Sequence, residues 1–176
     1  MKSPNNWYVI TGAPCSGKTI TLQAIEPKGY KVIYEAARMI IDKSISEGMT
    51  LTEIRKDELD FQRKVLRLKL SIEEQLPKNE ITFLERGIPD SYAYYHLCKA
   101  SSDSELLLSM KNCRYKKVFL LDRLVFLKDY ARTEDENTAQ RLHLLLKKGY
   151  KKIHADIITV PVMSIKERVD YILNNI

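Results

Sequence analysis

An octapeptide near the start of the chain constrains the fold more than any other stretch. It reads GAPCSGKT from Gly12 to Thr19, with two glycines separated by four residues and followed by Lys and Thr. The β-favouring run Trp7–Thr11 precedes it, and residues 19–25 can continue as a helix. A strand, a tight loop and a helix N-terminus direct backbone N–H groups and the positive helix dipole end to one point. The octapeptide therefore fits the phosphate-binding loop pattern, and the alternative is a chance match in a glycine-containing turn.

The residue types within this loop each suit the binding of a nucleoside triphosphate. Gly12 and Gly17 let the backbone approach an anion closely, Lys18 would reach the β- and γ-phosphates, and Thr19 would ligate Mg²⁺. Cys15 is interpreted as a small loop filler, with a reactive thiolate as the alternative. The expected nucleotide-binding residues are Gly12, Ala13, Pro14, Cys15, Ser16, Gly17, Lys18 and Thr19.

Length and composition favour one domain over residues 1–176. The 176 residues are 44% hydrophobic and 30% charged, which is ordinary for a globular protein. The apolar runs are too short to span a bilayer, and residues 1–6 lead into the first strand without a signal-peptide pattern. Three cysteines without metal-ligand spacing indicate a reducing, cytoplasmic setting.

The net charge of +6 could suit nucleic acid, a membrane surface or an anionic substrate. The basic clusters lack the aromatic interleaving of a single-strand binder. We therefore expect most of this charge to lie on solvated helix faces or to face the nucleotide.

A second strand is predicted over residues 30–34, and it ends in Glu35. A carboxylate at the carboxyl end of a strand lies where α/β sheets bind ligands. Glu35 is therefore a candidate base or Mg²⁺-shell residue, and Arg38, one turn later, a candidate phosphate or substrate clamp. The alternatives are an exposed capping carboxylate and an ordinary surface arginine.

A long helical pattern runs from residue 51 to residue 76. For Gln62, within it, we expect a side chain exposed to solvent, and the alternative is one that faces an acceptor pocket. The apolar stripe of this predicted helix consists of Ile54, Phe61, Val65, Leu68, Ile72 and Leu76.

A third strand is predicted over residues 81–84, and acidic and basic residues follow it. In a phosphate-loop protein, an acid that closes a neighbouring strand, here Glu85, holds Mg²⁺ directly or through water. Arg86 beside it can contact the transferring phosphate. Asp90 and Ser91 follow on the same stretch, and either one could simply help to start the next helix, because both residue types occur at helix starts.

A fourth strand is predicted over residues 115–121. The following segment, about 123–137, is dense in charge and poor in core residues. That composition suits a lid that orders over phosphates and then releases them, and a solvated loop is the alternative.

The C-terminal part completes an alternating pattern. A helix is predicted over 138–147 with its end at Gly149, then a strand over 153–160, a turn over 161–164 and a helix over 165–176. Strands that alternate with helices predict an α/β fold with a parallel sheet covered on both faces.

Several motifs in this order resemble those of a known family. They are GAPCSGKT, YEAAR, ERGIPDSYAYY, VFLLD, YARTEDE and VPVMSIKERVDYIL. Together they resemble the small P-loop ATPase family that includes the ribosylnicotinamide-kinase (NadR-type) domains, which is itself similar to nucleoside and nucleoside-monophosphate kinases. The resemblance covers nearly the whole chain.

The resemblance implies a nucleotide-kinase-like fold with a five-stranded parallel sheet, an ATP site and a lid. It implies that Glu35 is a catalytic base, that Glu85 and Arg86 are the Mg²⁺-shell acid and the phosphate-binding arginine, and that Arg132 is a lid arginine. Asp90 would lie near the acceptor. The loop that packs on the adenine would include Pro161, Val162 and Ser164.

This sequence also departs from the family pattern. The family more often has Asp at the position of Glu85, a second hydroxyl residue at Ile20 and a neutral residue at Arg123. These departures bear on the acceptor and on the turnover rate, and leave ATP binding as expected.

The sequence-based hypothesis is a phosphotransferase that uses ATP, or GTP, with Mg²⁺ and a small nucleoside-like acceptor. Lys18, Glu35, Arg86 and Arg132 are its predicted catalytic residues, and Arg38 would add charge stabilisation. One rival is an NTPase switch with a macromolecular or lipid partner. A second is a nucleic-acid-binding protein, which rests on net charge alone. A monomer or a homodimer is expected.

Overall fold

Five parallel strands form one sheet in the computed structural model, which describes residues 5–123 and 136–176. The order across the sheet is β2-β3-β1-β4-β5. The strands are β1 (Trp7–Thr11), β2 (Lys31–Ile33), β3 (Thr82–Glu85), β4 (Lys117–Leu121) and β5 (Ile157–Val160).

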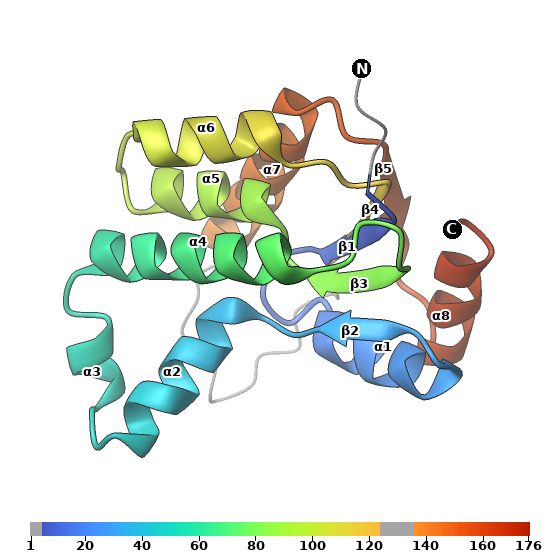
Figure 1. The fold of residues 1–176 in the computed structure, drawn as a ribbon, viewed down its shortest axis with the longest axis horizontal. Coiled ribbons are helices and arrows are strands. Elements are labelled where there is room, and N and C mark those ends of the chain that lie inside the picture. The colour runs from blue at the N-terminus through green and yellow to red at the C-terminus, as the bar shows by residue number, and fades with distance from the viewer. Residues whose placement is uncertain (1–4, 124–135) are drawn as a thin grey trace.

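Helices cover both faces of this sheet. Figure 1 shows α4, α5, α6 and α7 on one side and α1 with α8 on the other. The helices are α1 (Lys18–Ile25), a short 3₁₀ turn η1 (Glu26–Lys28), α2 (Ala36–Ser46), α3 (Leu51–Ile54), α4 (Glu58–Gln75), α5 (Ile88–Leu97), α6 (Ser104–Asn112), α7 (Glu136–Lys152) and α8 (Ile165–Leu173).

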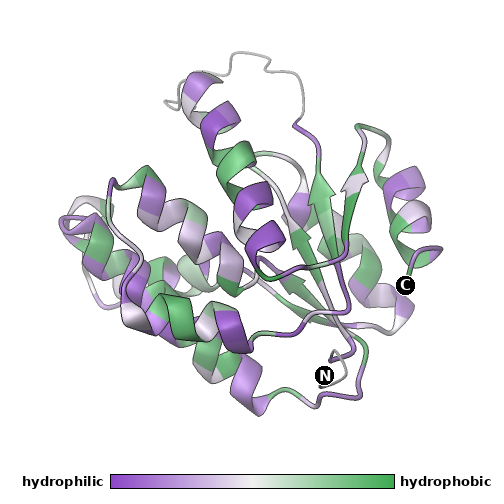
Figure 2. Ribbon diagram, turned by 90° about the horizontal axis from the view of Figure 1, so that it is seen from above, coloured by the Kyte–Doolittle hydropathy of each residue, from purple (hydrophilic) through white to green (hydrophobic). Residues whose placement is uncertain are grey.

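The central strand β1 supplies both halves of the core because side chains alternate along a strand. Trp7 and Val9 pack in the cluster beneath α4–α7, whereas Tyr8 and Ile10 pack in the cluster beneath α1 and α8. Figure 2 shows the same pattern as apolar strands flanked by helices of mixed polarity. The predicted α/β fold with a five-stranded parallel sheet is confirmed.

The long helix predicted over 51–76 is in fact two helices, α3 and α4. Asp57 starts the second one, since its side chain accepts a hydrogen bond from the N–H of Asp60 at 2.9 Å. The predicted apolar stripe is largely correct, with Phe61 and Val65 buried. The expectation of an exposed Gln62 is wrong, because its side chain is only 5% exposed.

Gly149 does not end a helix as predicted, and α7 continues through it to Lys152. A Cβ at Gly149 would come within 2.7 Å of the carbonyl oxygen of Pro89, so this glycine permits close packing of α7 on α5. The longer helix shortens the last strand, which begins at Ile157 rather than at residue 153.

Arg132 and most of the predicted lid, 123–137, lie outside the described residues. None of the helices within the described ranges combines the length and apolarity needed to cross a membrane.

Candidate active site

The predicted phosphate loop connects β1 to α1 at the carboxyl edge of the sheet. Gly17 has φ 83°, in the left-handed region that favours glycine, and it is the N-cap of α1. A Cβ at Gly12 would come within 2.7 Å of the Ser16 hydroxyl and 2.9 Å of the Leu121 carbonyl oxygen. Both glycines are therefore needed for this loop geometry.

Lys18 folds back over the loop, and its ammonium donates to the carbonyl oxygen of Ala13 at 3.0 Å. Burial and the charge of Arg86 lower the pKa of Lys18 to about 8, although Glu35, Glu85 and Asp90 oppose this shift. An anion placed against this side chain would favour its charged form.

Thr19 and Glu85, the predicted metal-shell pair, are in direct contact. The hydroxyl of Thr19 donates to Oε1 of Glu85 at 2.8 Å. Burial and the nearby Glu35 raise the pKa of the Glu85 carboxyl, while the bond from Thr19 opposes that rise. A hydroxyl with one carboxylate fits Mg²⁺, which takes few protein ligands and completes its shell with water and phosphate oxygens.

Arg86 lies at the centre of the site. Its Nε donates to Oε1 of Glu35 at 2.8 Å, and its Nη1 donates to the carbonyl oxygen of Gly12 at 3.1 Å and to Oδ1 of Asp90 at 2.9 Å. Its guanidinium also lies 5.2 Å from the ring centroid of Tyr94. The backbone of Arg86 has φ 64°, an unfavourable value that these contacts hold in place.

Glu35 is thereby kept ionised. Burial disfavours its charged form, but Arg86, Lys18 and Lys69 outweigh that effect and lower its pKa. Glu35 is also the N-cap of α2, without a capping bond from its side chain. The predicted candidate base therefore has its carboxylate directed at Arg86 rather than at its own helix.

Asp90, which the resemblance places near the acceptor, is buried behind Arg86 and does not line the cleft. It is 0% exposed. Its carboxylate accepts from Thr11 at 2.6 Å, from the N–H of Gly87 at 3.0 Å, from Arg86 and, in a short contact, from Tyr150. A carboxylate so enclosed holds Arg86 in position.

Lys69 is a site residue that the sequence analysis missed, since most basic residues of the helices were expected to lie on solvated faces. It is 5% exposed, and its ammonium donates to the carbonyl oxygen of Gly87 at 2.9 Å and to the Ser91 hydroxyl at 3.4 Å. Burial lowers its pKa, while Asp90 and Glu35 oppose the shift.

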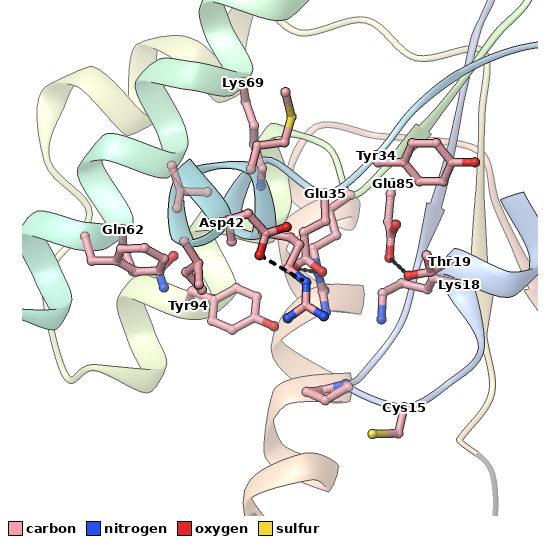
Figure 3. A pocket seen from close by; sticks show the side chains of 18 of the residues that line it. Cys15, Lys18, Thr19, Tyr34, Glu35, Asp42, Gln62, Lys69, Glu85 and Tyr94 are labelled. Atoms are coloured by element: carbon pink, nitrogen blue, oxygen red, sulfur yellow. Dashed lines mark hydrogen bonds and ion pairs between the residues drawn. The ribbon is translucent and has the colours of Figure 1, made fainter. Parts of the chain in front are cut away.

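With the exception of Asp90, the charged groups described above line a cleft of about 920 Å³. Figure 3 shows Lys18, Thr19 and Glu85 on one side of it and Gln62 and Tyr94 on the other, with Glu35 between them. The cleft therefore continues well past the phosphate loop. Its lining away from the loop includes Ala37, Arg38, Ile41, Asp42, Arg55, Phe61, Gln62, Val65 and Tyr94.

The other predicted ligand residues lie in more exposed positions. The side chain of Arg38 lines the cleft, is 74% exposed and has its Nε 3.8 Å from Oδ1 of Asp42. Pro161 and Val162 are exposed after β5. Ser164 caps α8, since its hydroxyl accepts from the N–H of Glu167 at 3.3 Å.

Sequence comparison decides the family. A sequence profile described as an AAA domain matches residues 7–168. The chain belongs to this AAA domain family. Among proteins with curated functions, none gave a significant sequence match.

Solved structures of several kinases share the fold. A deoxyadenosine kinase from M. mycoides, solved with dCMP and dCDP, has a TM-score of 0.66 at 16% identity, with 96% of this chain and 97% of that chain covered. A thymidylate kinase from Ehrlichia chaffeensis has a TM-score of 0.67 at 13% identity, with coverages of 99% and 98%. A NadR protein in complex with NR has a TM-score of 0.68 at 12% identity, and the match covers 96% of this chain and 49% of that chain.

Proposed function

We propose that this chain is a phosphotransferase that moves the γ-phosphoryl group of ATP to a hydroxyl of a small, nucleoside-like acceptor. The observation that carries this proposal is the pair of Glu35 and Arg86, joined at 2.8 Å beside the phosphate loop in a cleft that continues beyond it. A simple nucleotide switch needs a site for phosphates. It has no need of a half-buried carboxylate, that of Glu35, paired with an arginine beside the loop.

The groups around the reacting phosphate would act by position and charge. Lys18 and Arg86 would stabilise charge on the migrating phosphoryl group, and Arg132 is proposed to do so from the predicted lid. Mg²⁺, held by Thr19 and Glu85, would neutralise charge on the phosphate oxygens. The proposed nucleotide-side contacts of Pro161, Val162 and Ser164 remain part of this hypothesis.

Glu35 would orient the acceptor hydroxyl and take its proton. The acceptor oxygen forms a bond to the γ-phosphorus as the bond from that phosphorus to the β-γ bridging oxygen breaks, and ADP leaves. Because Arg86, Lys18 and Lys69 lower the pKa of Glu35, its carboxylate is ionised at neutral pH and can accept a hydrogen bond from the acceptor hydroxyl. Arg38 is proposed to contact the acceptor from the exposed rim of α2.

The lining of the far part of the cleft supports a nucleoside-like acceptor. Phe61, Val65 and Tyr94 provide apolar and aromatic surface there, whereas Gln62 and Arg55 provide hydrogen-bonding groups. A flat heterocycle with polar edges, attached to a hydroxylated sugar, matches both features. The ligands bound in two of the similar structures, dCMP with dCDP in one and NR in the other, are of this chemical kind.

A phosphoryl-transfer screen tests the proposal. The protein with Mg²⁺ and γ-labelled ATP is offered nucleosides, nicotinamide riboside and nucleoside monophosphates, while free phosphate is followed in parallel. We expect label on one acceptor class, loss of transfer in Glu35→Gln, and normal transfer in Glu47→Gln, the same change at the exposed end of α2. Label released only as phosphate, whatever the acceptor, would instead establish the hydrolytic switch.

A further inference from the structure

Arg168 on α8 contacts the phosphate loop but does not line the cleft. It is 3% exposed although it comes from the last helix of the chain. Its Nη1 lies 3.2 Å from the carbonyl oxygen of Ser16, 3.5 Å from that of Gly17 and 3.2 Å from the hydroxyl of Thr21. The sequence analysis did not single out Arg168 as a residue that contacts the loop.

This arginine is a buried charge without a carboxylate partner within the described ranges. It forms no ion pair there, and its buried Nε has no hydrogen-bond partner among the residues described. Burial lowers its pKa. A buried cation without an anion is costly for stability, so a purely structural role would be served better by an apolar side chain.

The carbonyl groups that it contacts determine where two N–H groups of the loop point. In a trans peptide the C=O and the following N–H are antiparallel. When the carbonyl of Ser16 faces Arg168, the N–H group of Gly17 therefore faces the opposite way, towards the phosphate side. The Gly17 carbonyl also accepts from the N–H of Thr21 at 3.1 Å and from its hydroxyl at 2.7 Å, so Arg168 and α1 together orient the Lys18 N–H group. A hydrogen bond from a cation also polarises each peptide group and strengthens its N–H as a donor.

The fit between the loop and the arginine is tight. A Cβ at Gly17 would come within 2.4 Å of Nη1 of Arg168. The capping box of Ser164 and Glu167 fixes the start of α8 immediately before Arg168. The position of this guanidinium is therefore constrained both by the glycine of the loop and by the cap of its own helix.

We propose that Arg168 is a positioning residue of the phosphate loop, which holds the Ser16 and Gly17 peptide groups with their N–H bonds towards the bound polyphosphate and adds its positive charge behind them. This inference rests on the proposed function for the binding of nucleotide. It does not depend on the identity of the acceptor.

Binding measurements on Arg168→Met separate this role from a packing role. We expect the Kd for Mg·ATP and for Mg²⁺-bound inorganic triphosphate, by calorimetry, to rise about 10- to 100-fold, the range for loss of hydrogen bonds to a charged group. The Kd for adenosine, by ligand-observed NMR, should stay within about twofold. Partial unfolding would lower the number of sites and leave the Kd of the folded protein unchanged.

Lys166→Met is the matched control, since Lys166 is an exposed residue of the same helix and its loss changes the net charge equally. If Arg168→Met fails to fold in a thermal melt, the neutral Arg168→Gln takes its place with the same expected results. Unchanged triphosphate binding, an equal loss in Lys166→Met, or an equal weakening of adenosine would overturn the inference. Failure of the unaltered protein to bind ATP would instead defeat the proposed function.

Discussion

Arg86 and Glu35 form an ion pair that joins the carboxyl ends of β3 and β2 across 2.8 Å. The two residues are 51 positions apart in the sequence, and the parallel pairing of β2 with β3 brings them together. The guanidinium is almost fully buried, whereas the carboxylate keeps part of its surface in the cleft. The pair thus has one member fixed in the core and one available to a ligand.

Replacement of Glu35 by Gln should reduce the rate of phosphoryl transfer far more than the affinity for nucleotide. The amide keeps the shape of the side chain but cannot accept the proton, so we expect a fall in kcat of about 10²- to 10⁴-fold, the usual contribution of a general base. The Kd for Mg·ATP, measured by calorimetry without acceptor, should change far less. A kcat close to that of the unaltered protein would show that Glu35 is not the base.

Replacement of Tyr150 by Phe tests the support beneath Arg86. The Tyr150 hydroxyl donates to Asp90 and accepts from the N–H of Gly87 at 3.0 Å. Its loss removes two hydrogen bonds from a buried network in which Gly87 and Asp90 remain bonded to each other, and we expect destabilisation of about 1–3 kcal/mol in denaturant unfolding. Because Asp90 remains ionised and paired with Arg86, kcat should fall less than in Asp90→Asn, which removes the only carboxylate that the described residues place on Nη1 of Arg86. Equal kcat in the two variants would contradict this order.

Replacement of Gln62 by Leu should weaken the binding of the acceptor and leave the binding of the nucleotide unchanged. The Gln62 amide donates to Oε1 of Glu58 at 2.9 Å and lies at the far side of the cleft (Figure 3). Leucine keeps the bulk but removes the hydrogen-bonding edge, so the acceptor KM should rise about tenfold or more while the KM for ATP stays constant. A proportional rise in both KM values would argue against a role in acceptor recognition.

The phosphate loop, the strands and their polar ends could be predicted from local patterns. A short motif identifies β1 and the loop, and Glu35, Glu85 and Arg86 stand at the ends of apolar runs. A parallel sheet brings the carboxyl ends of its strands to one edge, so the meeting of these residues follows from the strand pattern.

The burial of polar residues on helices could not be predicted in the same way. Lys69 and Gln62 look like solvent-facing positions of an amphipathic helix, and they are buried because α2 and α5 pack against α4. Arg168 likewise lies in a charged stretch, and its burial depends on the packing of α8 against α1. Helix periodicity identifies the apolar face but does not show where a second surface covers the polar one.

Gly149→Ala distinguishes close packing from helix propensity. Alanine in place of glycine favours a helix by about 1 kcal/mol, whereas a Cβ 2.7 Å from the Pro89 carbonyl oxygen forces a shift that costs about 1–3 kcal/mol. We expect net destabilisation in thermal or denaturant unfolding. Lys148→Ala, at an exposed position of the same helix, should be neutral or stabilising, and a stabilised Gly149→Ala would show that α7 and α5 separate easily.

Glu73 should make the stability of the protein depend on pH in the mildly acidic range. Burial raises its pKa from 4.5 to about 7, although the hydrogen bond from Tyr115, at 2.6 Å, and the charge of Lys69 oppose the shift. The Cys113 thiol, in the core cluster beneath α4–α7, is another titratable group near Glu73. Between these two pKa values the folded state holds a proton that the unfolded state releases. The stabilisation is therefore complete below about pH 4.5 and is lost as the pH rises through 7.

Glu73→Gln removes this dependence because the amide is neutral at every pH and can still accept from Tyr115. We expect the free energy of unfolding of the variant, from urea titrations at a series of pH values between 5 and 8, to fall less with rising pH than that of the unaltered protein. The variant should also be the more stable of the two at pH 8. Glu74→Gln, the same change at the exposed neighbouring residue, should leave the slope unchanged. Parallel pH profiles for all three proteins would show that Glu73 ionises normally and that water reaches it in the folded state.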